Sequence, residues 1–167
     1  MRNYRTTITI IFILIIGVLF RTYFIERIIV NGNSMSETFE NGHVVIIRRF
    51  GVNQINRFDV VVVMVEGRSM LKRVVGLPTE TILLNQGKIY INGTLIYDRH
   101  GTSFIYGGIA EMNEIILVYD EYFLLGDNRE YSKDSRHFGA VRNNDIRGVV
   151  IFQLFPFNRI GIVRMED

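Results

Sequence analysis

Three short segments of the chain contain residue types that could together carry out hydrolytic chemistry. The first covers residues 31–39, Asn-Gly-Asn-Ser-Met-Ser-Glu-Thr-Phe, and places Ser34 among turn-forming residues. A serine hydroxyl becomes a nucleophile when a neighbouring base accepts its proton. On its own the segment has the composition of an ordinary polar turn, so its chemistry depends on a base elsewhere in the chain.

The second segment, residues 69–78, offers such a base. It reads Ser-Met-Leu-Lys-Arg-Val-Val-Gly-Leu-Pro, and on a strand Met70, Lys72 and Val74 share one face while Arg73 points away. A lysine with an ordinary pKa of ~10.4 is a poor base at neutral pH, but burial can lower that value by roughly 3–5 units. The alternative is an edge lysine whose ammonium reaches water.

The third segment, residues 126–141, is Gly-Asp-Asn-Arg-Glu-Tyr-Ser-Lys-Asp-Ser-Arg-His-Phe-Gly-Ala-Val. Opposite charges alternate along it, at Asp127, Arg129, Asp134 and Arg136, with Ser132 between them. An exposed ion pair contributes little by itself, so this density of charges favours a fixed loop. Such a loop could be an ordered surface element or could orient a catalytic base.

The rest of the chain predicts a mostly β domain, an antiparallel barrel or folded sheet, that would position these segments. Short apolar runs predict buried strands, and Asn92-Gly93 between two β-prone runs predicts a hairpin. The predicted strands cover residues 44–47, 60–65, 88–97, 122–128 and 148–155. No sustained helical periodicity occurs after residue 26, and residues 99–114 resemble a surface excursion.

The N-terminus predicts a membrane anchor. Residues 6–20 carry no charge, and counting on to residue 25 gives the roughly 20 residues that a crossing needs. A cleaved signal peptide is the alternative, but no small-x-small site follows. Arg2 and Arg5 would keep the N-terminus in the cytoplasm, so we expect an anchor over 1–25 and an extracytoplasmic catalytic domain over 26–167.

Composition excludes several classes of function. The 167-residue chain has no cysteine, which rules out disulfides and thiol catalysis. Its net charge of +2 comes from scattered basic residues, which argues against a nucleic-acid partner. Neither a metal-ligand cluster nor a cofactor motif is apparent in the sequence, so we expect no cofactor.

Taken together, the three segments resemble, in order and spacing, the conserved boxes of the bacterial type I signal peptidases (S26 family), in their compact Gram-positive form. Residues 34–38 correspond to the family's Ser-Met-x-Pro-Thr box, and residues 72–80 to its Lys-Arg-Val-Ile/Val-Gly-Leu-Pro-Gly-Asp box. Residues 126–141 match the final box, Gly-Asp-Asn-Arg-x-x-Ser-x-Asp-Ser-Arg-x-x-Gly-x-Val, in full. The resemblance covers nearly the whole chain.

The resemblance implies a membrane-bound serine endopeptidase that cuts N-terminal signal peptides from secreted preproteins at small-x-small sites. Ser34 would attack the scissile carbonyl, Lys72 would take its proton, and Ser132 would hydrogen-bond the lysine amine. Asp134 and Arg136 would form a supporting ion pair. The resemblance further implies that Asp127 and Arg129 brace the same loop.

The family also implies where the oxyanion and the substrate would bind. The backbone N–H of Ser34 would meet the oxyanion, and Gly32 stands where some relatives supply a second, hydroxyl donor. The substrate would lie as an extended strand against two segments of the enzyme. The residues implied are Val30, Asn31, Gly32, Asn33, Met35, Ser69, Met70 and Leu71. Preproteins and the lipid bilayer are the implied partners, with a secretion translocon or pilus proteins as further candidates.

Two departures from the family pattern favour a specialised member. Glu37 replaces the proline of the first box, and Thr79-Glu80 replace Gly-Asp in the second. One alternative is therefore a non-proteolytic relative that assists pilus or surface-protein assembly, although Ser34 and Lys72 are both retained. A Ser-His-Asp hydrolase is a weaker alternative, because the chain has no Gly-x-Ser-x-Gly elbow.

Overall fold

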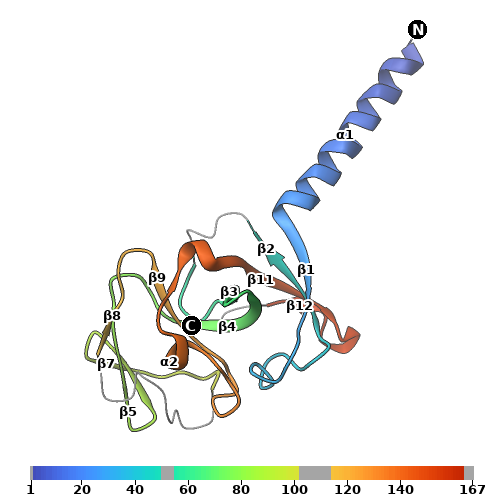
Figure 1. The fold of residues 1–167 in the computed structure, drawn as a ribbon. Coiled ribbons are helices and arrows are strands. Elements are labelled where there is room, and N and C mark those ends of the chain that lie inside the picture. The colour runs from blue at the N-terminus through green and yellow to red at the C-terminus, as the bar shows by residue number, and fades with distance from the viewer. Residues whose placement is uncertain (1, 50–54, 102–113, 164–167) are drawn as a thin grey trace.

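The computed structural model describes residues 2–49, 55–101 and 114–163. Helix α1, Arg2–Phe24, projects away from the body of the protein and leads directly into strand β1 (Figure 1). Along residues 4–17 the helix exposes its side chains, most of them large and apolar. Of the segments that the structure describes, none qualifies as a helix long and apolar enough to cross a membrane.

A large antiparallel sheet makes up most of the body. Among the described residues it has eight strands in the order β1-β2-β11-β3-β4-β9-β10, with β12 pairing to β11. The strands are β1 (Ile25–Ile29), β2 (Val44–Arg48), β3 (Val60–Val65), β4 (Arg68–Gly76), β9 (Glu121–Leu125), β10 (Val141–Arg142), β11 (Ile146–Phe155) and β12 (Gly161–Ile162). The long strand β11 lies between β2 and β3 and pairs with both, and register shifts interrupt each of these pairings.

The apolar runs of the sequence form the central strands because both faces of the sheet are covered. In β3 the valines alternate between two hydrophobic clusters, with Val60 and Val62 in one and Val61 and Val63 in the other. A strand buried on both faces reads as a continuous apolar run. β4 alternates as predicted, since Met70 and Val74 join the cluster of Val61 and Val63, whereas Leu71 joins the other cluster.

A smaller sheet lies beside the large one (Figure 1). Its order among the described residues is β7-β6-β5-β8, and its strands are β5 (Thr81–Asn85), β6 (Lys88–Ile91), β7 (Thr94–Ile96) and β8 (Ile115–Ile116). Asn92 and Gly93 both have positive φ, 49° and 77°, as the predicted hairpin turn requires. A third hydrophobic cluster, which includes Ile82 and Phe123, fills the space between the sheets.

The prediction of a mostly β, antiparallel fold is therefore confirmed. Beyond α1, the described helical segments are a single-turn helix α2 (Ser135–Phe138) and the 3₁₀ turns η1 (Asn143–Asp145) and η2 (Phe157–Arg159). Each strand expected from the sequence is present, with ends shifted by a few residues. Most of the expected excursion at 99–114 lies outside the described residues.

Candidate active site

Ser34 lies in a tight turn between β1 and β2 that the hydrophobic core holds down. Met35 and Phe39 are each 1% exposed, and the N–H groups of Thr38 and Phe39 both donate to the Met35 carbonyl. The Ser34 carbonyl accepts a hydrogen bond from the backbone N–H of Asn128, at 3.1 Å. The third segment is thus bonded directly to the turn that presents the serine.

Lys72 lies in the middle of β4, opposite Val61 of β3, and its side chain is 2% exposed. Its Nζ donates to Ser34 Oγ at 2.7 Å and to the Leu71 carbonyl at 2.9 Å. Burial of the amine lowers the pKa of Lys72 from 10.5 to about 8, although the charges of Asp134 and Asp127 raise it. The structure therefore brings together a serine hydroxyl and an amine suited to accept its proton.

The four charged residues of the third segment that the sequence singles out, Asp127, Arg129, Asp134 and Arg136, are all buried and paired, but two of them pair with distant partners. Asp127 receives two hydrogen bonds from Arg73 of β4, at 2.8 and 2.7 Å. Arg129 pairs with Asp98, which follows β7 of the small sheet. Because these two partners come from different parts of the fold, contacts from outside the loop fix it as well as contacts within it.

Asp134 and Arg136 form the local ion pair that the sequence predicts. Arg136 donates from Nε and Nη2 to the two carboxylate oxygens, at 2.8 and 2.9 Å. Burial alone would raise the pKa of Asp134, but the bonds and charge of Arg136 hold it below its usual value. Asp134 also caps α2 and accepts the N–H of Gly126, so its charge stays close to Lys72.

Ser132 is not joined to Lys72, which differs from the expectation. Its hydroxyl is buried and makes no hydrogen bond to the amine, although it lies close enough to Asp134 to help lower the pKa of that carboxyl. The second bond of the amine goes instead to the Leu71 carbonyl, one residue before it in the strand. Ser132 nevertheless lies at the site, because a Cβ on Gly126 would come within 2.2 Å of its Oγ and 2.5 Å of the Ser34 carbonyl oxygen.

A groove of about 350 Å³ lies between β1 and the first half of β4. Of the residues expected to bind substrate, five line it: Val30, Asn31, Ser69, Met70 and Leu71. The other three do not. Gly32 and Asn33 are exposed in the turn, and the Met35 side chain is buried in the core.

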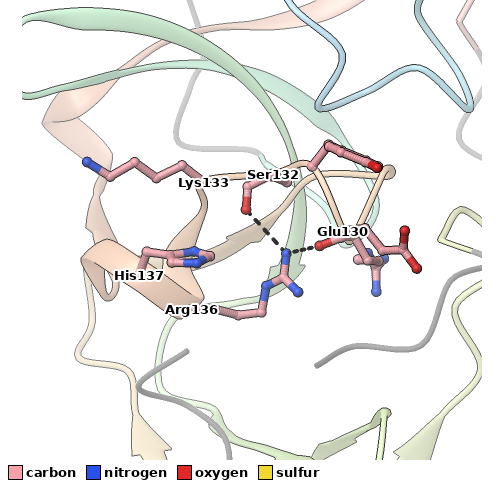
Figure 2. A pocket seen from close by; sticks show the side chains of 7 residues that line it. Glu130, Ser132, Lys133, Arg136 and His137 are labelled. Atoms are coloured by element: carbon pink, nitrogen blue, oxygen red, sulfur yellow. Dashed lines mark hydrogen bonds between the residues drawn. The ribbon is translucent and has the colours of Figure 1, made fainter. Parts of the chain in front are cut away.

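A second hollow, of about 550 Å³, lies on the third segment and does not include the dyad. Figure 2 shows its walls, where Arg136 donates to the carbonyl oxygens of Arg129 and Ser132. The same guanidinium also donates to Asp134, so the bonds of Arg136 stabilise the loop. No group of three metal-ligating side chains occurs within the described residues.

Sequence patterns missed the long-range members of the site. Asp127 accepts hydrogen bonds from Arg73 and from the Thr38 hydroxyl, and Arg73 also donates to that hydroxyl. Arg129 forms its ion pair with Asp98. Arg73 follows Lys72 directly and Thr38 lies within the first segment, so their positions hinted at a role. Nothing around Asp98 distinguishes it from an exposed turn residue.

The fold and the site together define a class of protein, a β-sheet hydrolase with a serine–lysine pair. Comparison with known protein families identifies the class more closely. A family model described as signal peptidase, peptidase S26, matches residues 3–155. The chain therefore belongs to the signal peptidase family, whose members are serine endopeptidases that process signal peptides.

Relatives of known name agree. The chain is 35% identical to signal peptidase I V of Bacillus subtilis (strain 168) over 135 residues, 72% of this chain and 80% of that protein. It is 31% identical to signal peptidase I of Streptococcus pneumoniae serotype 4 over 192 residues, 90% of this chain and 93% of that protein. The crystal structure of a signal peptidase I from Enterococcus faecalis superposes with a TM-score of 0.50 at 28% identity, covering 57% of this chain and 96% of that one.

Proposed function

We propose that this chain cleaves signal peptides from preproteins with Ser34 as nucleophile and Lys72 as general base. The observation that carries the proposal is the 2.7 Å bond from a buried lysine amine to a serine hydroxyl. The protonated amine donates this bond to the serine oxygen. Once the amine has lost its proton, the serine hydroxyl becomes the donor and the amine the acceptor. The neutral amine then accepts the hydroxyl proton as Ser34 attacks the carbonyl.

The tetrahedral intermediate needs donors for its oxyanion. In this proposal the backbone N–H of Ser34 supplies one, as in other acyl-transfer sites. Gly32 has a φ of +90°, a conformation that a residue with a side chain adopts only with strain. The turn itself therefore disfavours a hydroxyl-bearing residue at Gly32. Collapse of the intermediate leaves an acyl-enzyme on Ser34, and Lys72 passes the proton to the leaving amine.

The groove supports a substrate bound as an added strand. Among the described residues β1 pairs only with β2, and β4 pairs with β9 only from Arg73 onward. Two strand edges without partners, Ile25–Ile29 and Arg68–Lys72, therefore border one groove. An extended peptide there could bond to both edges, with side chains at alternate positions facing the enzyme. In this proposal, small residues occupy two such positions just before the scissile bond.

Helix α1 is proposed as the membrane anchor, with residues 26–167 as the catalytic domain outside the cytoplasm. The uncharged stretch 6–20 and the exposed apolar side chains of the helix support this role. Arg2 and Arg5 before the stretch support a cytoplasmic N-terminus. An anchored enzyme meets its substrate where the signal peptide enters the same bilayer, which makes the membrane the second partner.

The test is cleavage of a secreted preprotein by the detergent-solubilised full chain, followed by mass spectrometry of the products. We expect one cut after a small residue, and loss of that cut in Ser34→Ala and in Lys72→Ala. Lys88→Ala, which removes an exposed lysine from the small sheet, is the matched control and should cleave normally. Full cleavage by both dyad variants would refute the assignment.

A further inference from the structure

The end of the substrate groove farther along β1 from Ser34 carries positive charge. Arg27 of β1 and Arg147 of β11 both line the groove, together with apolar residues of β1, β3 and β4. Val30 and Leu71 line it as well, closer in sequence to Ser34 and Lys72. The groove thus changes from apolar and neutral near the dyad to cationic away from it.

The local carboxylates do not balance this charge. Glu26 accepts two hydrogen bonds from Arg147 and lies 3.7 Å from Arg49. Within the described part of the chain, no carboxylate pairs with Arg27. Glu26 is therefore shared by two guanidinium groups, those of Arg147 and Arg49, and Arg27 is available to an anion that enters the groove.

We propose that Arg27, assisted by Arg147, selects preproteins whose signal peptide carries an acidic side chain at the position lying over the cationic end of the groove. This inference rests on the proposed function. A peptide is favoured over a lipid headgroup because the two arginines share the groove with the free edges of β1 and β4. A strand bound between those edges must pass them.

The spacing limits where the acidic residue would be. Arg27 precedes Ser34 by seven residues, and an extended chain rises about 3.3 Å per residue. If the substrate strand runs alongside β1 with the same rise per residue, the residue next to Arg27 is roughly five to eight positions before the scissile bond. Because side chains alternate between faces, acidic residues at neighbouring positions should differ in effect.

The experiment is a position scan with the detergent-solubilised full chain. A neutral reference peptide with a small-x-small site receives Glu, Gln or Lys at each position from four to nine residues before the bond. We expect one Glu position to lower KM about fivefold relative to Gln with kcat unchanged, the size of an exposed ion pair. Lys at that position should raise KM.

Variants of the enzyme then locate the effect. Arg27→Gln should bring the Glu-to-Gln ratio of KM close to one, and Arg27→Glu should reverse the preference so that Lys is favoured. Arg142→Gln, which removes an exposed arginine on β10 outside the groove, is the control and should keep the wild-type ratio.

Each other outcome overturns the inference in a distinguishable way. If the reference peptide is cleaved but no position separates Glu from Gln, the inference fails and the proposed function stands. If the reference peptide is never cleaved, the proposed function is wrong, and the inference that rests on it is wrong as well. If Arg27→Gln keeps the peptide preference but loses sedimentation with phosphatidylglycerol vesicles, Arg27 serves the lipid surface instead.

Discussion

The large and small sheets are built from similar strands, yet they bury very different side chains. The small sheet packs apolar residues such as Ile82, Leu84 and Ile89 into a single cluster. The large sheet and the loop after β9 bury Lys72 and three ion pairs as well. Burying charge usually costs stability, whereas apolar packing supplies it. The small sheet therefore mainly stabilises the fold, whereas the large sheet and its loop bury charged groups that lower stability but form the active site.

Two ion pairs connect these regions. Arg57 donates to both oxygens of Glu80, just before β5, at 3.0 and 2.6 Å. Arg129 of the loop pairs with Asp98, just after β7, and donates to the Gly126 carbonyl at 2.8 Å. The first pair is partly exposed and the second is buried. We expect the small sheet to brace the active-site loop mainly through Asp98.

Replacing Lys72 should have the largest effect, and it should change catalysis and stability in opposite directions. Lys72→Met should lower kcat/KM by about 10³-fold or more, because the base is lost. A pKa lowered to about 8 means that the charged amine is disfavoured in the folded state by about 3 kcal/mol. The variant should therefore unfold at higher denaturant concentration at pH 7, measured by urea titration.

The sign of the stability effect can be checked against pH. Lys72 is protonated in both states below pH 8, where the folded state bears the full cost. It is neutral in both states well above pH 10.5, where no cost remains. The stability advantage of Lys72→Met should thus shrink as pH rises from 8 to 10.5. Lys88→Met, on the exposed surface of the small sheet, should show neither change.

Breaking the buried link between the sheets should come next. Asp98→Ala leaves Arg129 buried without its carboxylate, which typically costs 3–5 kcal/mol. Glu80→Gln, at the more exposed pair, should cost about 1 kcal/mol or less. Urea unfolding of both variants measures the difference. Equal losses would mean that the buried pair is not the main brace.

The local part of this architecture could be predicted from the sequence, and the long-range part could not. Asn92-Gly93 dictates its own turn, and the alternation of β4 follows from the pleat of a strand. The alternating charges of residues 126–141 predict ion pairs, and the pair of Asp134 with Arg136 lies within reach of local geometry. Arg129 instead pairs across 31 residues with Asp98. That partner depends on how the small sheet docks, which no short pattern encodes.

The same reasoning applies to the nucleophile and its base. Ser34 and Lys72 are 38 residues apart, and no local rule brings them together. The resemblance supplied the pairing, but it also led to the prediction of a bond from Ser132 to the amine, which the structure does not contain. A serine hydroxyl has several rotamers, so a shared motif fixes its position more firmly than its hydrogen bond. The substrate roles inferred from the motif remain predictions.

A methyl group on Gly126 should have an intermediate effect that is specific to the active-site loop. The added Cβ would meet Ser132 and the Ser34 carbonyl oxygen at 2.2–2.5 Å, so one of the segments must move. A displacement near 1 Å can lower the rate by about 10²-fold. Gly76→Ala, which would contact Ile82 at 2.7 Å, should cost stability by overpacking and leave kcat of the folded enzyme largely unchanged. Peptide cleavage and urea unfolding of both variants test this contrast.

The smallest effect should be a shift in pH dependence. In the wild type, kcat/KM should rise with a midpoint near pH 8 as Lys72 loses its proton. The charge of Asp134 raises the pKa of Lys72, so Asp134→Asn should move the midpoint to lower pH, by less than about one unit. The charge of Arg136 already lowers the pKa of Lys72, and without the opposing carboxylate it acts in the same direction. Asp145→Asn, an exposed carboxylate of η1, should leave the midpoint in place. An upward shift in Asp134→Asn would mean that the buried carboxylate does not control the proton affinity of the base.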